Sequence, residues 1–180
     1  MGAPKRNRKK FDKPKDIWNL ARINADNALI KEYGLKNMSE LWKVQSELSR
    51  IRGNVRLLLS GATSTGNVEQ ALKTRLVKLG IIDKDTPIEK LLELSERNIL
   101  DRRLESVVYK RGMARSMKQS RQLITHGFVS INGRKLTVPG YLVNAEEESK
   151  IGYYKPIDIV PAKHEEAKAE TEPSVEQAEN

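Results

Sequence analysis

The chain of 180 residues has no cysteine, only 5% aromatic residues and no long apolar run. Without cysteine it can form no disulfide, thiolate zinc site or iron–sulfur cluster, and it has no cysteine nucleophile. A membrane-spanning helix needs about 18 or more consecutive apolar residues, and no such run occurs. Residues 1–15 are charged rather than apolar. We therefore expect no secretory signal and no membrane partner.

Basic residues are what the sequence has in excess, because 33 Lys and Arg oppose 24 Asp and Glu, for a formal charge of +9. The excess is concentrated in two segments. Residues 1–15 hold seven basic side chains against one acid, and residues 100–145 hold nine against two, whereas residues 16–99 are nearly neutral. A merely solvated surface would mix its signs more evenly, so this concentration predicts an anionic partner, first of all a nucleic acid.

Composition divides the chain into four parts. Residues 1–15 lack an apolar period and are expected to be a basic disordered arm, and residues 162–180 an acidic disordered tail rich in glutamate. Residues 16–99 are predicted to form a helical region, and residues 100–161 a small domain of two helices and a hairpin. The expected fold class is α+β, with a helical N-terminal region followed by this helix–helix–β-hairpin domain.

Apolar spacing and capping residues predict where the helices and strands lie. In the helical region they predict helices from Asp16 to Gly34, from Asn37 to Leu59, from Asn67 to Gly80, and from Thr86-Pro87 onward. In the second region they predict a helix over 100–111, a helix capped by Ser116 with Gln119, a hairpin turning at Asn132-Gly133, and strands within 151–160.

The basic side chains of the second region are predicted to form two faces. Helical spacing places Arg103, Ser106 and Lys110 on one face of the first helix, and Lys118, Arg121 and Gln122 on the outer face of the next. Long cationic side chains can reach phosphates at different depths. A helix pair on a hairpin suits recognition of folded RNA by shape and backbone, which favours RNA over DNA. For any single residue, plain solvation remains an open alternative.

These residues resemble a known family. The stretch "LDRRLESVVYKRGMARSMKQSRQLITHGFVSINGRKLTVPGYLV" (100–143) resembles the S-four RNA-binding domain. Upstream, "KFDKPKDIW" and "EYGLKNMSELWKVQSELSRIRGNVRLLL" are similar to the N-terminal region of the archaeal and eukaryotic S-four family of small-subunit ribosomal proteins. The resemblance spans about residues 1–160. It implies a structural protein that binds small-subunit ribosomal RNA early in assembly, near the mRNA entrance, and supports translation and its accuracy.

The resemblance also implies partners and contact residues. The partners would be small-subunit ribosomal RNA and neighbouring proteins, notably the one numbered five, with mRNA as a further possibility. The location would be the cytoplasmic ribosome. The expected RNA-binding residues are Arg102, Arg103, Lys110, Arg111, Arg115, Ser116, Lys118, Gln119, Arg121, Gln122 and His126, with Arg134 and Lys135 on the hairpin and Lys5, Arg6, Arg8, Lys9 and Lys10 in the arm.

Two other classes of function stay open at this point. Pseudouridine synthases and a tRNA synthetase carry the same small domain, but they need a large catalytic domain with an essential aspartate, and Asp101 is poorly placed for that role. A free RNA-handling factor, such as those that rescue stalled large subunits, needs no helical region of this size. We therefore expect a protein that is not an enzyme.

Three motifs suggest cofactor chemistry and fail on inspection. Gly61 and Gly66 have the spacing of a phosphate-binding loop, but Asn67 follows where that loop needs lysine. His126 and His164 have no companions at metal-ligand spacing, and the acidic run 146–148 is better read as a solvated turn. No cofactor or metal is expected.

Overall fold

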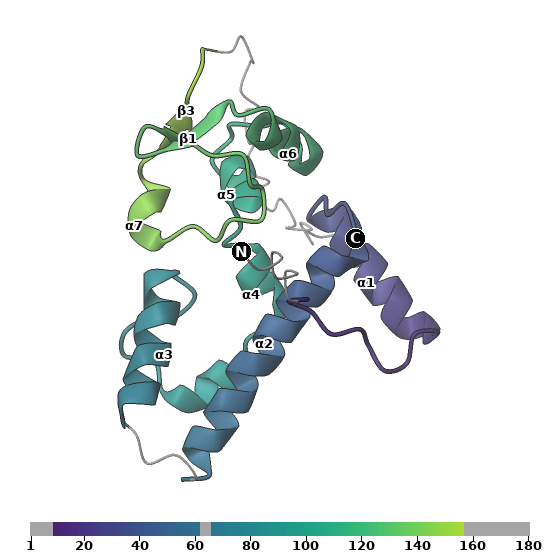
Figure 1. The fold of residues 1–180 in the computed structure, drawn as a ribbon, viewed down its shortest axis with the longest axis vertical. Coiled ribbons are helices and arrows are strands. Elements are labelled where there is room, and N and C mark those ends of the chain that lie inside the picture. Colours follow the sequence, from purple (N-terminus) through teal and green to yellow (C-terminus); the bar gives the residue numbers. More distant parts are fainter. Residues whose placement is uncertain (1–8, 62–65, 157–180) are drawn as a thin grey trace, which may run out of the picture.

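The computed structural model describes residues 9–61 and 66–156. The molecule is elongated, with a helical part and a mixed part stacked along its long axis (Figure 1). The fold is α+β. The helical part holds α1 (Leu20–Glu32), α2 (Met38–Leu59), α3 (Gly66–Lys78), the 3₁₀ turn η1 (Ile88–Leu92) and α4 (Glu96–Leu100); the mixed part holds α5 (Leu104–Lys110), α6 (Met117–Thr125), β1 (Val129–Ile131), β2 (Arg134–Lys135), α7 (Ala145–Glu148) and β3 (Ile151–Tyr153).

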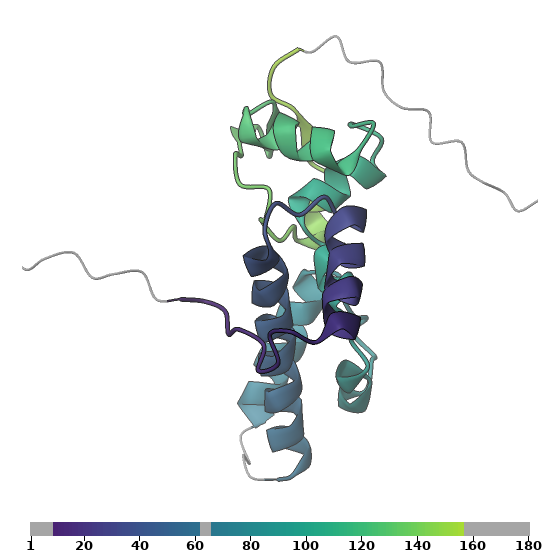
Figure 2. The same cartoon turned by 90° about the vertical axis from the view of Figure 1, so that its right-hand side faces the viewer.

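Helix α1 starts later than the sequence predicts. The expected cap was Asp16, but Asn19 caps the helix instead, its side-chain oxygen accepting a hydrogen bond from the Arg22 N–H. Trp18 stays outside the helix and is 88% exposed. The predicted end is confirmed, because Gly34 adopts the left-handed conformation that terminates helices. Helix α1 lies alongside α2 (Figure 2).

Helix α2 is the longest of the described elements, and α1, η1 and α4 pack against it. It begins after Asn37, as predicted, and buries one stripe of five side chains: Leu41, Val44, Leu48, Ile51 and Val55. The Asn37 side chain makes no capping hydrogen bond, so it does not cap α2. The Glu40 carboxylate is instead engaged by arginines from the mixed part.

The helix predicted from Thr86-Pro87 is a five-residue 3₁₀ turn. Leu91 and Leu94, three residues apart, are both buried in the core of the helical part. A second start follows at Ser95, where a capping box with Asn98 opens α4. The helix that starts after Pro87 therefore continues for only about one turn. Burial of both leucines in the core favours this short 3₁₀ turn over a longer α-helix.

The helix predicted over 100–111 is also interrupted. Asp101 and Arg102 form a turn, and Arg103 adopts an extended conformation as the residue before α5. Its backbone bridges to Leu142, and the next N–H, of Leu104, donates to the Tyr141 carbonyl. Leu100 belongs to the core of the helical part and Leu104 to that of the mixed part. The break lets the chain leave one core and enter the other.

The hairpin and the third strand form a small antiparallel sheet in the order β2-β1-β3. Asn132 and Gly133 both have positive φ, which confirms the predicted two-residue turn. The sequence 128–131 alternates apolar and polar residues, but all three residues of β1 are buried. Strand β1 is central, because β3 pairs with the edge of β1 that a two-stranded hairpin would leave open. Residues 157–160 of the predicted third strand lie outside the described residues.

Candidate nucleic-acid interface

Exposed basic and polar side chains gather on α6 and the hairpin beside it. Helix α6 packs on α5 and keeps one side in solvent, where Lys118, Gln122 and His126 lie. Arg115 precedes the helix and is exposed, as is Arg111 at the end of α5, whose guanidinium donates to the Ile151 carbonyl at 3.2 Å. Among the described residues, no carboxylate is paired with Lys118, Gln122 or His126.

Ser116 and Gln119, both predicted RNA contacts, make hydrogen bonds at the start of α6. The Ser116 hydroxyl accepts a hydrogen bond from the Gln119 N–H at 3.2 Å, which confirms the predicted cap. The Gln119 side chain accepts from the Arg115 N–H at 2.7 Å. These bonds fix the turn that carries Arg115 and orient the helix, so that its positive end lies beside Lys118.

Strand β2 adds cations at the edge of the sheet. Arg134 and Lys135 are both exposed, and Lys135 lies across the turn that follows α6. A Cβ atom added at Gly127 would lie 2.0 Å from the Lys135 Cε. The positive φ of Gly127 is what favours glycine there, since the exposed end of Lys135 can move aside. The close approach puts cations at both ends of α6.

Other predicted contact residues are held by carboxylates. Arg102 pairs with Glu148 of α7 at 2.8 Å and also donates to the Val143 carbonyl. Lys110 pairs with Asp101 at 3.0 Å, but both side chains are exposed, so this pair can open at little cost. Arg102 is mostly buried and serves to fasten α7.

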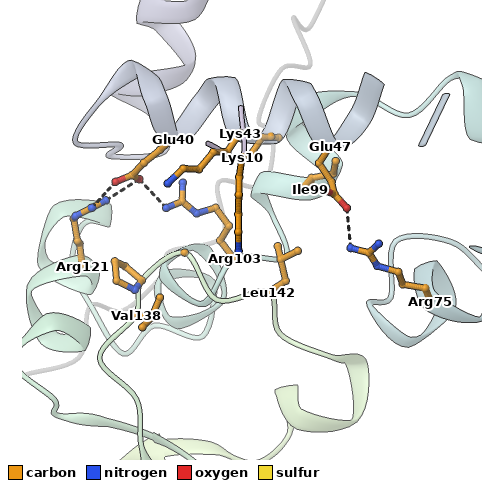
Figure 3. A pocket seen from close by; sticks show the side chains of 13 residues that line it. Lys10, Glu40, Lys43, Glu47, Arg75, Ile99, Arg103, Arg121, Val138 and Leu142 are labelled. Carbon is orange, nitrogen blue, oxygen red and sulfur yellow. Dashed lines mark hydrogen bonds and ion pairs between the residues drawn. The ribbon is translucent and has the colours of Figure 1, made fainter. Parts of the chain in front are cut away.

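A buried cluster of charges joins α2 to the mixed part (Figure 3). The Glu40 carboxylate accepts from Arg103 at 2.8 Å and from Arg121 at 2.6 Å. Glu105, only 1% exposed, lies 3.6 Å from Arg103 and 3.4 Å from Arg121. Two guanidinium groups thus share two carboxyl groups contributed by helices that are far apart in sequence. We call these four residues the junction cluster.

The two carboxyl groups of the junction cluster differ in acidity. Burial raises the pKa of Glu105 to about 7, and the attraction of Arg103 and Arg121 only partly opposes it. Burial also acts to raise the pKa of Glu40, but hydrogen bonds from Arg121 and Arg103 outweigh it, so the pKa of Glu40 lies below its usual range. Glu40 is the carboxylate that these arginines share, whereas Glu105 titrates near neutral pH.

The junction cluster overturns two predicted faces. Arg103 is buried at the start of α5 and does not share a helix face with Ser106 and Lys110; Ser106 is itself buried and donates to the Leu100 carbonyl. Arg121 does not lie on a free outer face of α6, because it turns toward Glu40. Helical periodicity could not reveal this partner, which lies 81 residues away.

The described end of the arm lies along α2. Phe11 packs near Trp42 with ring centroids 5.9 Å apart, and the Asp12 N–H donates to the Ser46 hydroxyl at 3.0 Å. The Lys9 ammonium lies over the Phe11 ring. These contacts bring Lys10 to the side of α2. The other predicted arm residues, Lys5, Arg6 and Arg8, and the acidic tail, lie outside the described residues.

In residues 9–61 and 66–156, no three acidic, histidine or cysteine side chains are grouped as a metal ion would require. Within those ranges no helix has the length and apolarity to cross a membrane. The arrangement that the described part does offer is electrostatic: long cations around α6 and β2, positioned by a capped helix and a tight hairpin. Such groups bind phosphates and fix the register of a nucleic acid.

Comparisons with known proteins identify one family of similar chains. The family described as "S4 domain" matches residues 102–149. The small ribosomal subunit protein uS4 of Methanothermobacter thermautotrophicus is 43% identical over 155 residues, which cover 86% of this chain and 91% of that protein. The uS4 protein of Saccharolobus solfataricus is 41% identical, with 86% of each chain covered, and that of Methanosphaera stadtmanae is 37% identical over 98% of this chain and 100% of its own.

Proposed function

The chain belongs to the uS4 family of small ribosomal subunit proteins, and on that premise we propose how it binds small-subunit ribosomal RNA. The protein is a structural component of the cytoplasmic ribosome and not an enzyme. Its S4 domain binds RNA chiefly through the side chains around α6 and β2. The binding organises the RNA by neutralising phosphates that a folded junction brings together.

One observation carries this proposal: exposed cations surround α6 while nearby carboxylates are directed elsewhere. Asp101 is paired with Lys110, Glu105 is buried, and Glu148 is paired with Arg102. The phosphate contacts are assigned to exposed residues, namely Lys110, Arg111, Arg115, Lys118, Gln122, His126, Arg134 and Lys135, together with the arm residues Lys5, Arg6, Arg8, Lys9 and Lys10. Arg102, Arg103, Ser116, Gln119 and Arg121 position this surface.

The proposal also includes two specific partners besides ribosomal RNA. Small-subunit protein number five and mRNA near its entrance are proposed as neighbours, and the support is the resemblance of residues 1–160 to the archaeal and eukaryotic branch of the family. The proposed division into arm, helical region, RNA-binding domain and tail follows the distribution of charge. A free RNA-binding factor, or an accessory of an RNA-modifying enzyme, would wash off small subunits in high salt. A ribosomal protein sediments with them, so gradient sedimentation separates these alternatives.

Binding of a small-subunit rRNA transcript from a relative such as Methanothermobacter thermautotrophicus tests the RNA-binding surface. The double variant K118A/R134A removes two exposed cations that have no carboxylate partner among the described residues. The slope of log affinity against log salt should fall by about 1.4–1.8, since each lost phosphate contact removes about 0.7–0.9. The matched control K36A/K84A removes two exposed lysines of the helical part and should leave the slope unchanged. An unchanged slope in K118A/R134A would assign these cations to solvation alone.

A further inference from the structure

A basic hollow lies where the helical part meets the mixed part. It occupies about 580 Å³ between α2 and the segment 138–142. Figure 3 shows Lys10 and Lys43 extending into this space, with the Glu40–Arg103–Arg121 contacts at one end and the Glu47–Arg75 pair at the other. We propose that this hollow, named here the junction groove, binds a phosphodiester segment of the ribosomal RNA; the proposal rests on the proposed function.

The charges of the junction groove do not cancel. Its acidic side chains are already neutralised, Glu40 by two arginines and Glu47 by Arg75 and Arg50. Lys10 and Lys43 have no such partner among residues 9–61 and 66–156. Each lysine is exposed and flexible, and an ammonium group binds phosphate as a point charge without strict geometry. Two unpaired lysines that face one hollow therefore favour an anionic ligand there.

Arg103, at one end of the junction groove, adds to this positive charge. Arg103 is 5% exposed, and its Nη1 has no acceptor within the described residues. Its neighbour Glu105 has a pKa of about 7, so the junction cluster carries net positive charge over part of the neutral range. Buried charge of this kind is weakly screened and raises the potential at the mouth of the groove.

Further cationic residues lie beyond both ends of the junction groove, as an extended ligand such as a nucleic-acid strand would need. A second hollow of about 640 Å³ shares Lys10, Lys43, Glu47 and Arg75 with it and extends along α2 past Phe11. At the other end, Arg121 belongs to α6, whose exposed Lys118 lies one helical turn earlier. A backbone that leaves the α6 surface can thus follow a path of cations along α2. This continuity with the proposed RNA surface favours RNA over an acidic protein segment as occupant.

The salt dependence of rRNA binding tests the groove in the full chain. With the same transcript, K10A/K43A should lower the slope by about 1.4–1.8 and weaken binding about tenfold in moderate salt, whereas K10R/K43R, which keeps both charges, should retain the wild-type slope. K36A/K84A serves as the control for loss of two exposed lysines elsewhere. Thermal melts should be unchanged for every variant, because neither groove lysine makes a described ion pair.

The outcomes separate the two proposals. If wild type binds the rRNA transcript no better than an unrelated RNA, the proposed function fails. If wild type is specific and K118A/R134A is weakened while K10A/K43A is not, the junction groove is overturned together with the phosphate contact assigned to Lys10, and the α6 and β2 surface stands. A photo-crosslinking residue placed at Lys43 in reconstituted small subunits gives a direct readout. A crosslink to rRNA supports the groove, and a crosslink to ribosomal protein alone overturns it in favour of a protein occupant.

Discussion

Lys118 and Arg121 are one turn apart on the same short helix, yet they have opposite surroundings. Lys118 is exposed without a carboxylate, while Arg121 is mostly buried between Glu40 and Glu105. The same contrast separates the α6 and β2 surface from the junction cluster. Cations that are alike in sequence thus divide into those available to an anionic ligand and those that hold the S4 domain against α2. The partner supplied by another element makes the difference.

The largest expected effect compares two glutamates of α2 with similar exposure, Glu40 at 18% and Glu47 at 20%. Glu40 pairs with buried arginines, but Glu47 pairs with Arg50 and Arg75, which are exposed. Glu40→Ala should lower the free energy of unfolding by about 3–5 kcal/mol, because the buried Arg103 and the mostly buried Arg121 lose the carboxylate that accepts their short hydrogen bonds and keep only Glu105, at 3.6 Å and 3.4 Å. Glu47→Ala should cost less than about 1 kcal/mol.

Urea unfolding of the two variants measures both values. Equal losses for Glu40→Ala and Glu47→Ala would show that the junction cluster is no more than a surface pair and would remove the contrast between the two regions.

The next effect is a pH dependence in the junction cluster. The pKa of Glu105 is about 7 in the folded chain against an ordinary 4.5, so the folded state holds this proton more tightly than the unfolded state. Its contribution to stability is therefore complete below pH 4.5 and is lost as pH rises through 7. The shift corresponds to about 3 kcal/mol.

Glu105→Gln keeps the size of the side chain and removes this titration. Between pH 5 and pH 8, the unfolding free energy of the wild type should decrease steadily relative to that of Glu105→Gln as pH rises. A difference that stays constant would show that Glu105 remains ionised throughout, as a surface carboxylate does.

The smallest effect compares two residues that precede helices. Ser116→Ala removes the hydroxyl that caps α6 and should cost about 1 kcal/mol of stability. Asn37→Ala removes a side chain that makes no capping bond to α2, and it should cost only a few tenths of that amount. Thermal melts of both variants check this ranking, and the reverse order would contradict the assigned caps.

Features that depend on neighbouring residues were predictable. The start of α2, the Ser116 cap, the glycine ends of helices and the Asn132-Gly133 turn all follow from preferences within a few positions. The interrupted helix at 101–103 and the five-residue turn at Ile88 were not predictable, because burial in two separate cores overrides the local pattern there. The α6 surface is predicted in part, but Arg103 and Arg121, predicted as RNA contacts on exposed helix faces, are held by Glu40, and Lys43 carries no signal in the sequence.

The amino-acid sequence alone predicts the class of ligand, because the distribution of charge is read directly from the chain. It also predicts most of the elements that present the charged residues, because backbone preferences act over a few positions. Which cations remain free to meet phosphate emerged only from folding. Glu40 reaches Arg103 and Arg121 across 63 and 81 residues, and Lys10 and Lys43 come to face one hollow, through packing that local spacing does not encode. The reason is physical: an ion pair depends on distance and desolvation in space, and neither is set by separation along the chain.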